Sequence, residues 1–545
     1  MSGVNVMGGG LVGAAFLMTG LAGCSGEPPQ KASTHAESGL VLLEQNWDDK
    51  QRDIAWYSSF GSRIVPLPWF LALERADGEQ PFSSPGNLAR FGFAQAGSSE
   101  RNPHGLPIGL ASTPPHQGRQ WLGLGCSACH SGQIYRGGKA LHIDGGQALV
   151  DFQLFEHEFI AALKATLADP AKFGRFAASV GEEPGKLKAE LEARSRKLVA
   201  RAELNATRHA YGRGRLDAFG QIFNAVTADF LAIPDNRREP DAPVSYPVLW
   251  DAPHLDLVQW NASAPNAGPG PLLQNATTAL AVFGELDIHS DGLGYGSSIE
   301  VNNLAEIQNL WYRLRAPAWP EQHLGAIDRE LAGRGQALYQ ANCQSCHGLA
   351  EETQGHRKLK ATAVPVAEVG TDPTMAANFV NARAKSGAFE GKKLLYAAGP
   401  VLGAEASSIE LVLHATVGAL LHHPVESLAA GFEGAHKVDG AKVSTRPYTY
   451  KARPLSGIWA SAPYLHNGSV PTLAALLSGQ RPARFPVGKV EFDPVAVGLS
   501  SRVLAPDQVS WFDTAEPGND NGGHRYGSQL SEAERTALLE YLKTL

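Results

Sequence analysis

The spacing of apolar positions predicts two helices in the last part of this chain. The first would end just before residue 342, and its apolar positions are Ile327, Leu331, Leu338 and Tyr339. The second would close the chain, with a capping box followed by apolar residues on one face: Ser531 and Glu534, then Leu538, Leu542 and Leu545. Gly335 and Tyr339 lie where the two helices would cross, because a glycine permits close approach.

Two other stretches have a clear pattern. Residues 161–206 are rich in Ala, Glu, Lys, Arg and Leu, and they predict a solvated helical excursion without chemistry of its own. Residues 11–24 form an apolar run, LVGAAFLMTGLAGC, that is too short to span a membrane as a mature helix. It resembles a bacterial lipoprotein signal that is cleaved before Cys24, although residues 1–10 contain no Lys or Arg. An ordinary cleaved signal and a misassigned start are the alternatives.

Composition extends this picture to the whole chain. The 59 glycines and 35 prolines among 545 residues favour long loops between short helices. The organisation that we expect is a signal peptide over 1–23, a tether over 24–45, an N-terminal region with insertions over 46–320 and a C-terminal region over 321–545. A net charge of −7 gives no basic patch that would favour nucleic-acid binding.

The cysteines indicate the chemistry of these two regions. Apart from Cys24 they form two C-x-x-C-H motifs, which are Cys126, Cys129 and His130, then Cys343, Cys346 and His347. A structural zinc site would need four ligands, and a redox dithiol would need no histidine and would not recur. C-x-x-C-H is the attachment motif of c-type haem: two thioethers hold the macrocycle and the histidine is the proximal iron ligand. Such attachment is made outside the cytoplasm, which agrees with an export signal.

With one motif in each region, we expect an N-terminal haem domain over 46–320 and a C-terminal cytochrome c domain over 321–545. The predicted fold class is mainly α, with two cytochrome c-like haem domains and long loop-rich insertions.

The ligand on the other side of each iron is harder to predict. Three of the four methionines lie in the signal segment, so Met375 is the single candidate for His/Met ligation, and packing is the alternative reading. His524 lies in the glycine-flanked loop GNDNGGHRYG just before the last helix, and we favour it as the distal ligand of the second haem. His466, in APYLHNGSVPTL, competes for that role.

Taken together, several stretches resemble the di-haem cytochrome c peroxidase superfamily, and more closely its rubber-oxygenase-like branch. They include WLGLGCSACHSGQIYRGGKALHIDGG, GRLDAFGQIFN, LWDAPHLDLVQWN and YKARPLSGIWASAPYLHNGSVPTL, and they extend over about residues 46–545. The resemblance implies a reactive, five-coordinate or weakly liganded N-terminal haem and a six-coordinate C-terminal haem that relays electrons. It also implies that His524 is the distal ligand, that His466 contacts a propionate or the inter-haem region, and that Arg453 is a propionate partner. The family has Arg where this chain has His142, which weakens or replaces a propionate contact.

Four residues are candidates for the chemistry itself. Phe219, with Phe223, would line an apolar pocket, and Glu285 would serve as a distal acid or base if it faced the haem. Trp260 is a candidate for the path between the haems. Core packing is the alternative for the three aromatic residues, and surface exposure is the alternative for Glu285.

The function that we expect is an exported di-haem oxidoreductase that reacts with peroxide or dioxygen. A haem-dependent dioxygenase cleaving an unsaturated hydrocarbon such as polyisoprene, and a pure electron-transfer cytochrome, are the alternatives. The expected partners are the small oxidant and a small electron-donor protein or organic donor. The protein would lie in the periplasm or cell envelope, held to the membrane only through a lipid on Cys24. Calcium between the haems, common in the superfamily, is left open.

Overall fold

The computed structural model describes residues 39–545 except 351, 354–355 and 435–446. It is 41% helical and 17% strand, so the content is mixed and the mainly α prediction holds only loosely. The strands are short, and most pair segments that are distant in sequence, which periodicity along the chain cannot detect. The predicted signal segment and Cys24 lie outside the described residues. Of the helices in the described part, none has the length and apolar character needed to cross a membrane.

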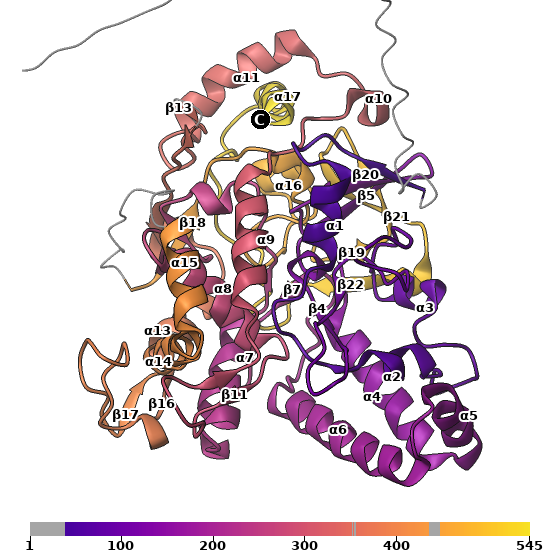
Figure 1. Ribbon diagram of the computed structural model, residues 1–545. Helices are drawn as coiled ribbons and strands as arrows, with labels where there is room; N and C mark the ends of the chain where they lie inside the picture. The colour runs from indigo at the N-terminus through magenta and orange to yellow at the C-terminus, as the bar shows by residue number, and fades with distance from the viewer. Residues whose placement is uncertain (1–38, 351, 354–355, 435–446) are drawn as a thin grey trace, which may run out of the picture. The chain divides into compact units, whose positions relative to one another are not determined.

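The two predicted terminal helices exist and cross closely. They are α11 (Arg329–Asn342) and α17 (Glu532–Thr544), and Figure 1 shows both near the C-terminus. A Cβ at Gly335 would lie 2.0 Å from the carbonyl oxygen of Ala537, so only glycine fits there. Beside that contact, the rings of Tyr339 and Tyr541 lie 5.2 Å apart. The predicted crossing is confirmed.

A second pair of helices frames the first motif. They are α1 (Asp49–Tyr57) and α9 (Val301–Arg313), which pack against each other. Trp47, just before α1, links this helix to α9, because its indole N–H donates a hydrogen bond to the carbonyl of Leu310 at 3.0 Å. The short helix η2 (Cys126–Ala128) packs on α1, and Ser127 donates to the carbonyl of Ala55 at 2.8 Å. Each motif therefore lies beside a pair of packed helices.

The insertions of the N-terminal region are largely helical. The predicted excursion over 161–206 corresponds to α4 (Phe152–Ala168), α5 (Pro170–Val180) and α6 (Pro184–Leu204), with α2 (Leu67–Ala72) against α5. Their apolar faces form an aromatic core with Phe70, Phe82 and Phe159. On another side, α7 (Ala218–Asn224) and the π-helix η3 (Ala225–Phe230) pack with α8 (Gly270–Ala281) and α14 (Ser408–Leu421), and α15 (Pro424–Gly434) follows.

One sheet joins the two predicted regions. Its strand order is β1-β6-β5-β20-β21, with bounds Leu40–Leu42, Lys139–Asp144, Ser131–Arg136, Val490–Asp493 and Gly498–Val503. The join is between β5 and β20, where Tyr135 is the partner of Glu491. The residues that the structure describes fall in one compact unit. The sheet therefore crosses the expected boundary near residue 320.

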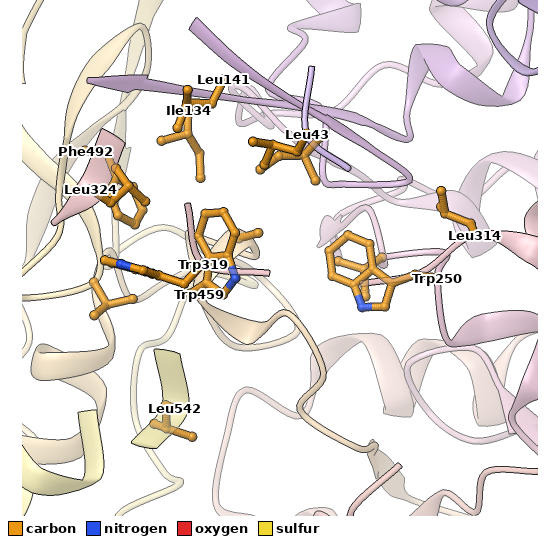
Figure 2. Close-up of a cluster of buried hydrophobic side chains, with 14 of the residues drawn as sticks. Leu43, Ile134, Leu141, Trp250, Leu314, Trp319, Leu324, Trp459, Phe492 and Leu542 are labelled. Atoms are coloured by element: carbon orange, nitrogen blue, oxygen red, sulfur yellow. The ribbon is translucent and has the colours of Figure 1, made fainter. Parts of the chain in front are cut away.

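The core beside this sheet also draws on both regions. Trp319 and Trp459 contact each other edge to face at 5.4 Å, and Phe492 of β20 packs on Trp319. Figure 2 shows Ile134 of β5, Leu141 of β6 and Leu43, which follows β1, in the same cluster. Short pairings complete the fold: β2 (Val65–Pro66) and β3 (Leu110–Ser112) with β4 (Trp121–Leu124), β7 (Arg215–Leu216) with β8 (Val244–Ser245), β15 (Thr362–Pro365) with β18 (Thr449–Ala452), β16 (Arg383–Lys385) with β17 (Glu405–Ser407), and β19 (Arg484–Gly488) with β22 (Val509–Asp513).

Candidate haem sites

The two C-x-x-C-H motifs adopt the same tight turn. The amide of His130 donates to the carbonyl of Cys126 at 3.1 Å, and the amide of His347 donates to that of Cys343 at 2.8 Å. In each turn the two sulfurs and the imidazole are brought close together, as attachment of one macrocycle requires. The four cysteines form no disulfide.

Each motif histidine is held through its Nδ1 by a distant carbonyl. His130 Nδ1 lies 2.9 Å from the carbonyl oxygen of Pro247, and His347 Nδ1 lies 2.8 Å from that of Arg453. A carbonyl only accepts, so the proton is on Nδ1 and Nε2 keeps a free lone pair. Burial lowers the pKa of His130 to about 4 and also lowers the pKa of His347, which keeps both rings neutral. A neutral, oriented imidazole is the state that binds iron.

The thiols do not resemble a redox dithiol. Burial raises the pKa of Cys126 and Cys129 to about 12 and that of Cys343 to about 11. A catalytic dithiol needs at least one thiol whose pKa is lowered. Among the residues described, no group of three or more His, Cys, Asp and Glu side chains is placed to hold a metal ion. The surroundings of these cysteines are therefore those of an apolar cofactor pocket.

A cavity of about 330 Å³ lies at the second motif. This falls in the range of roughly 300–1,000 Å³ that small-molecule and cofactor sites occupy. Its walls are mainly apolar, and its lining residues include Cys343, Cys346, His347, His524, Tyr450, Leu473, Leu477 and Leu542. It extends to Tyr246, Pro247 and Val248, the segment that holds His130.

His524 faces His347 across this cavity. The two ring centroids are 6.1 Å apart. The midpoint between the rings is half of that separation from each ring centroid. Subtracting the distance from the centroid to a ring nitrogen leaves about 2 Å, which is the length of a metal–imidazole bond in proteins. The Nδ1 of His524 is buried without a hydrogen-bond partner, and burial lowers the pKa of this histidine to about 4. These residues fit a haem iron held between two neutral imidazoles.

The backbone around His524 is arranged for this approach. The amide of His524 donates to the carbonyl of Val369 at 2.7 Å. Gly523 has a φ of +69°, and a Cβ there would lie 2.2 Å from the backbone of Gly370. The glycine is therefore required to bring the loop, and with it the histidine, against the cavity.

The two competing candidates for the distal ligand have other contacts. His466 lines the same cavity, but its ring stacks on Tyr450 at 4.0 Å, and its carbonyl accepts from the amide of Ser245 at 2.8 Å. Met375 is 2% exposed and packs with Ala242 and Tyr450, and it does not itself line the cavity. The structure gives Met375 the packing role.

Two buried cations line the cavity. Arg453, predicted to bind a propionate, is joined by Lys451 on β18, whose pKa is lowered to about 7 by burial and by Arg453. Asp251 lies 4.0 Å from Arg453 but is already paired with Arg357. The cations therefore suit the carboxylates of a haem.

The surroundings of the first motif are different. The ring of His130 contacts Tyr246 at 6.4 Å, and no second histidine ring is recorded against it in the described part of the chain. An apolar cluster borders Cys126 and contains Phe223, with Phe219 packed on its edge. Phe379, which sequence reasoning missed, contacts Phe219 at 4.6 Å. The predicted aromatic pair therefore packs with Phe379 in an apolar cluster that also contacts Cys126.

Two predicted residues take part in other interactions. Glu285 pairs with Arg63 at 3.0 Å, Lys197 at 2.9 Å and Arg194 at 3.7 Å. Burial alone would raise its pKa, but these cations lower it, so Glu285 stays ionised in an ion-pair cluster and the predicted role as a distal acid is not supported.

His142 is fully buried, and its Nε2 lies 3.2 Å from Asp144, away from the cavity lining. A direct contact from His142 to a propionate at that cavity is therefore not supported either. The residue belongs to a buried polar group around Asp144.

Trp260 lies between the two motifs. Its indole N–H donates to the carbonyl of Ser245 at 2.8 Å, and its carbonyl accepts from the amide of Lys451 at 2.7 Å. Ser245 is two residues from Pro247, and Lys451 is two residues from Arg453. Peptide and hydrogen bonds therefore connect His130 to His347 through Trp260, and we call this route the inter-histidine connection. Sequence reasoning missed Pro247 and Lys451, since no side-chain motif marks a backbone acceptor or a cation facing a cavity.

Comparison with known proteins identifies matching domain families and related sequences. Residues 449–486 match the family model described as RoxA-like, cytochrome c-like, and residues 330–394 match that of cytochrome c oxidase, cbb3-type, subunit III. Protein y4iJ of Sinorhizobium fredii (strain NBRC 101917 / NGR234), described as uncharacterized, is 33% identical over 93% of this chain and 93% of its own length. The chain belongs to the y4iJ family. Protein y4iM of the same strain, also described as uncharacterized, is 26% identical over 57% of this chain and 67% of its own length.

The two domain matches indicate the class of chemistry. The second motif, with His347, falls in one matched segment, and Arg453 and His466 fall in the other. Cytochrome c-like domains imply covalently bound haem c, and they indicate haem-based electron transfer or oxidoreduction.

Proposed function

We propose that this protein is an exported di-haem c-type oxidoreductase of the periplasm or cell envelope, held there by a lipid on Cys24. Cys126 and Cys129 would hold one haem, with His130 as its proximal ligand, at the site that meets a small oxidant, peroxide or dioxygen. Cys343, Cys346 and His347 would hold the second haem, at the site that receives electrons from a small donor protein or organic donor. When bound, these cofactors supply the redox chemistry.

One observation carries the division of roles: the two motif histidines face different surroundings. His347 faces a buried histidine across a cavity, whereas the recorded ring contact of His130 is with Tyr246. An iron with two strong axial ligands suits electron transfer, and an iron with an open position suits reaction with an oxidant. The chain thus favours a relay at the second site and chemistry at the first.

The remaining residues support that division by what they bind. The carbonyls of Pro247 and Arg453 orient the two imidazoles and keep them in one tautomer. Lys451 and Arg453 offer positive charge to propionates inside a cavity that is otherwise apolar. Trp260, in the inter-histidine connection, supplies an indole between the two sites.

The test compares matched histidine variants by electronic absorption and electron paramagnetic resonance. We expect one low-spin and one high-spin or exchangeable haem at rest, with cyanide binding at the latter. His524→Ala should turn the low-spin haem high-spin, while His466→Ala should leave it low-spin. If both haems are low-spin at rest and bind neither cyanide nor CO, the protein is an electron carrier only.

A second activity has an observation in its favour. The group of Phe219, Phe223 and Phe379 belongs to the apolar cluster that contacts Cys126, and Glu285, the carboxylate predicted as acid, is engaged in ion pairs. This suits cleavage of an unsaturated hydrocarbon such as polyisoprene by dioxygen. Turnover with peroxide and a reduced donor, against turnover of latex with dioxygen, separates the two substrates.

A further inference from the structure

A second, much smaller cavity lies directly behind the first motif. Its volume is about 10 Å³, roughly what one water-sized particle needs. Ser131, which follows His130 in the chain, lines it at the start of β5. The other lining residues come from both halves of the molecule: Gly92, Gln133, Tyr135, Leu149 and Arg213, then Gly488, Lys489 and Gln508.

The charged side chains that line this cavity are all positive. Arg213 is 3% exposed, and its two terminal nitrogens donate to the carbonyls of Arg90, at 2.5 Å, and Leu149, at 3.5 Å. Lys489 adds a second cation, 5.6 Å from the ring of Tyr135. Among the described lining residues none is a carboxylate. Two cations beside one cavity favour an anion, because a buried charge needs a partner.

Two hydrogen-bond donors at the cavity have no partner. They are the Nε–H of Arg213 and the hydroxyl of Ser131, whose oxygen is buried. Native proteins satisfy almost all such groups, either with protein atoms or with a bound particle. A single acceptor in the cavity would serve both donors.

The backbone leaves room for this arrangement. Gly488 has a φ of +127°, and a Cβ there would lie 2.7 Å from Cδ and 3.1 Å from Nε of Arg213. Any other residue would push the guanidinium aside. The glycine therefore holds open the approach to the unpartnered N–H.

We propose that the cavity binds a small monatomic anion of the halide class, held by Arg213 and Ser131 beside Lys489. Phosphate and carboxylate ligands are too large for it. The anion would tie β5, which begins next to His130, to the loop after β19, which belongs to the other half. This site is independent of the proposed redox function.

Bromide is the probe, and thermal unfolding of the full-length holoprotein is the first measurement. Sodium bromide is compared with sodium gluconate at equal ionic strength, since gluconate cannot enter the cavity. The unfolding midpoint should rise with bromide concentration and reach a plateau. Arg213→Gln and Ser131→Ala should each raise the half-saturating bromide concentration at least tenfold. Arg194→Gln is the matched control. Arg194 also donates to two backbone carbonyls, but it pairs with Glu285 and does not line the small cavity.

Anomalous scattering from crystals grown in bromide gives the second measurement. A peak within hydrogen-bond distance of Arg213 Nε and Ser131 Oγ is expected. The proposal is overturned if the cavity holds only a water, if bromide and gluconate give the same midpoints, or if both cavity variants respond to bromide as the control does.

Discussion

At the scale of single residues, the densest polar interactions surround Asp144 beneath the first motif. Its carboxylate accepts from Arg52 at 2.8 Å and from the indole of Trp56 at 2.7 Å, and His142 lies 3.2 Å away. Burial alone would raise the pKa of Asp144, but His142 and Arg52 lower it to about 2. The carboxylate is therefore ionised in the folded protein at neutral pH.

This group predicts an acid-sensitive stability. The pKa of Asp144 is lower in the folded than in the unfolded chain, where it is about 3.9, so its contribution is complete above about pH 4 and is lost as pH falls toward 2. Asp144→Asn leaves Arg52 buried without its anion and should cost about 3–5 kcal/mol at neutral pH. Denaturant unfolding between pH 3 and 7 measures both effects.

The control for this variant is Asp77→Asn. Asp77 pairs with Arg75, but its side chain is 70% exposed, and such exposed pairs contribute little to stability. Equal losses in the two variants would contradict the role given to Asp144.

At the residue scale, the sequence could name candidates where the residue type and its neighbours indicate the chemistry. His130, His347 and His524 could be named because C-x-x-C-H and a glycine-flanked histidine have few uses. Glu285 could not be interpreted, because its role depends on the cations of two distant segments. The same holds for His142, whose partner Asp144 is near in sequence but whose burial is set by β1 and α1.

At the scale of elements, the crossing of α11 and α17 positions the second motif. Gly335 is the contact point, whereas Gly333 on the same helix has nothing within 4 Å of its would-be Cβ. Gly335→Ala should therefore destabilise the protein by about 1–3 kcal/mol through overpacking, measured as loss of unfolding free energy. Gly333→Ala should stabilise it by up to about 1 kcal/mol, since alanine is the better helix former. Loss of stability in neither variant would mean that the helices do not meet at Gly335.

The sequence predicted the two terminal helices but not the pairing of distant strands. The helices α11 and α17 were marked by apolar spacing and, for α17, by a capping box, which are local signals. The pairing of β5 with β20 was not, because one register contact between Tyr135 and Glu491 leaves no periodic trace. The mixed fold class follows from such pairings.

At the scale of the whole molecule, the sheet and the inter-histidine connection both join segments on either side of residue 320. Besides the two motif histidines, Trp260 contributes a side-chain hydrogen bond to that connection, between Ser245 and the strand that carries Lys451. If electrons pass between the haems along this route, replacing the indole with a smaller ring that lacks the N–H slows the transfer without moving either iron ligand.

The variant that tests this is Trp260→Phe. Both haem spectra should stay as in the unaltered protein, since no ligand changes, while electron transfer between the haems should slow by at least about tenfold, equivalent to about 1.4 kcal/mol in activation free energy. Rapid reduction of one haem, followed by absorbance at the wavelength of the other, measures the rate. Trp511→Phe is the control, because Trp511 is 53% exposed on β22 and lies outside the connection. An unchanged rate in Trp260→Phe, with both haems intact, would remove Trp260 from the path and leave it as a packing residue between the two halves.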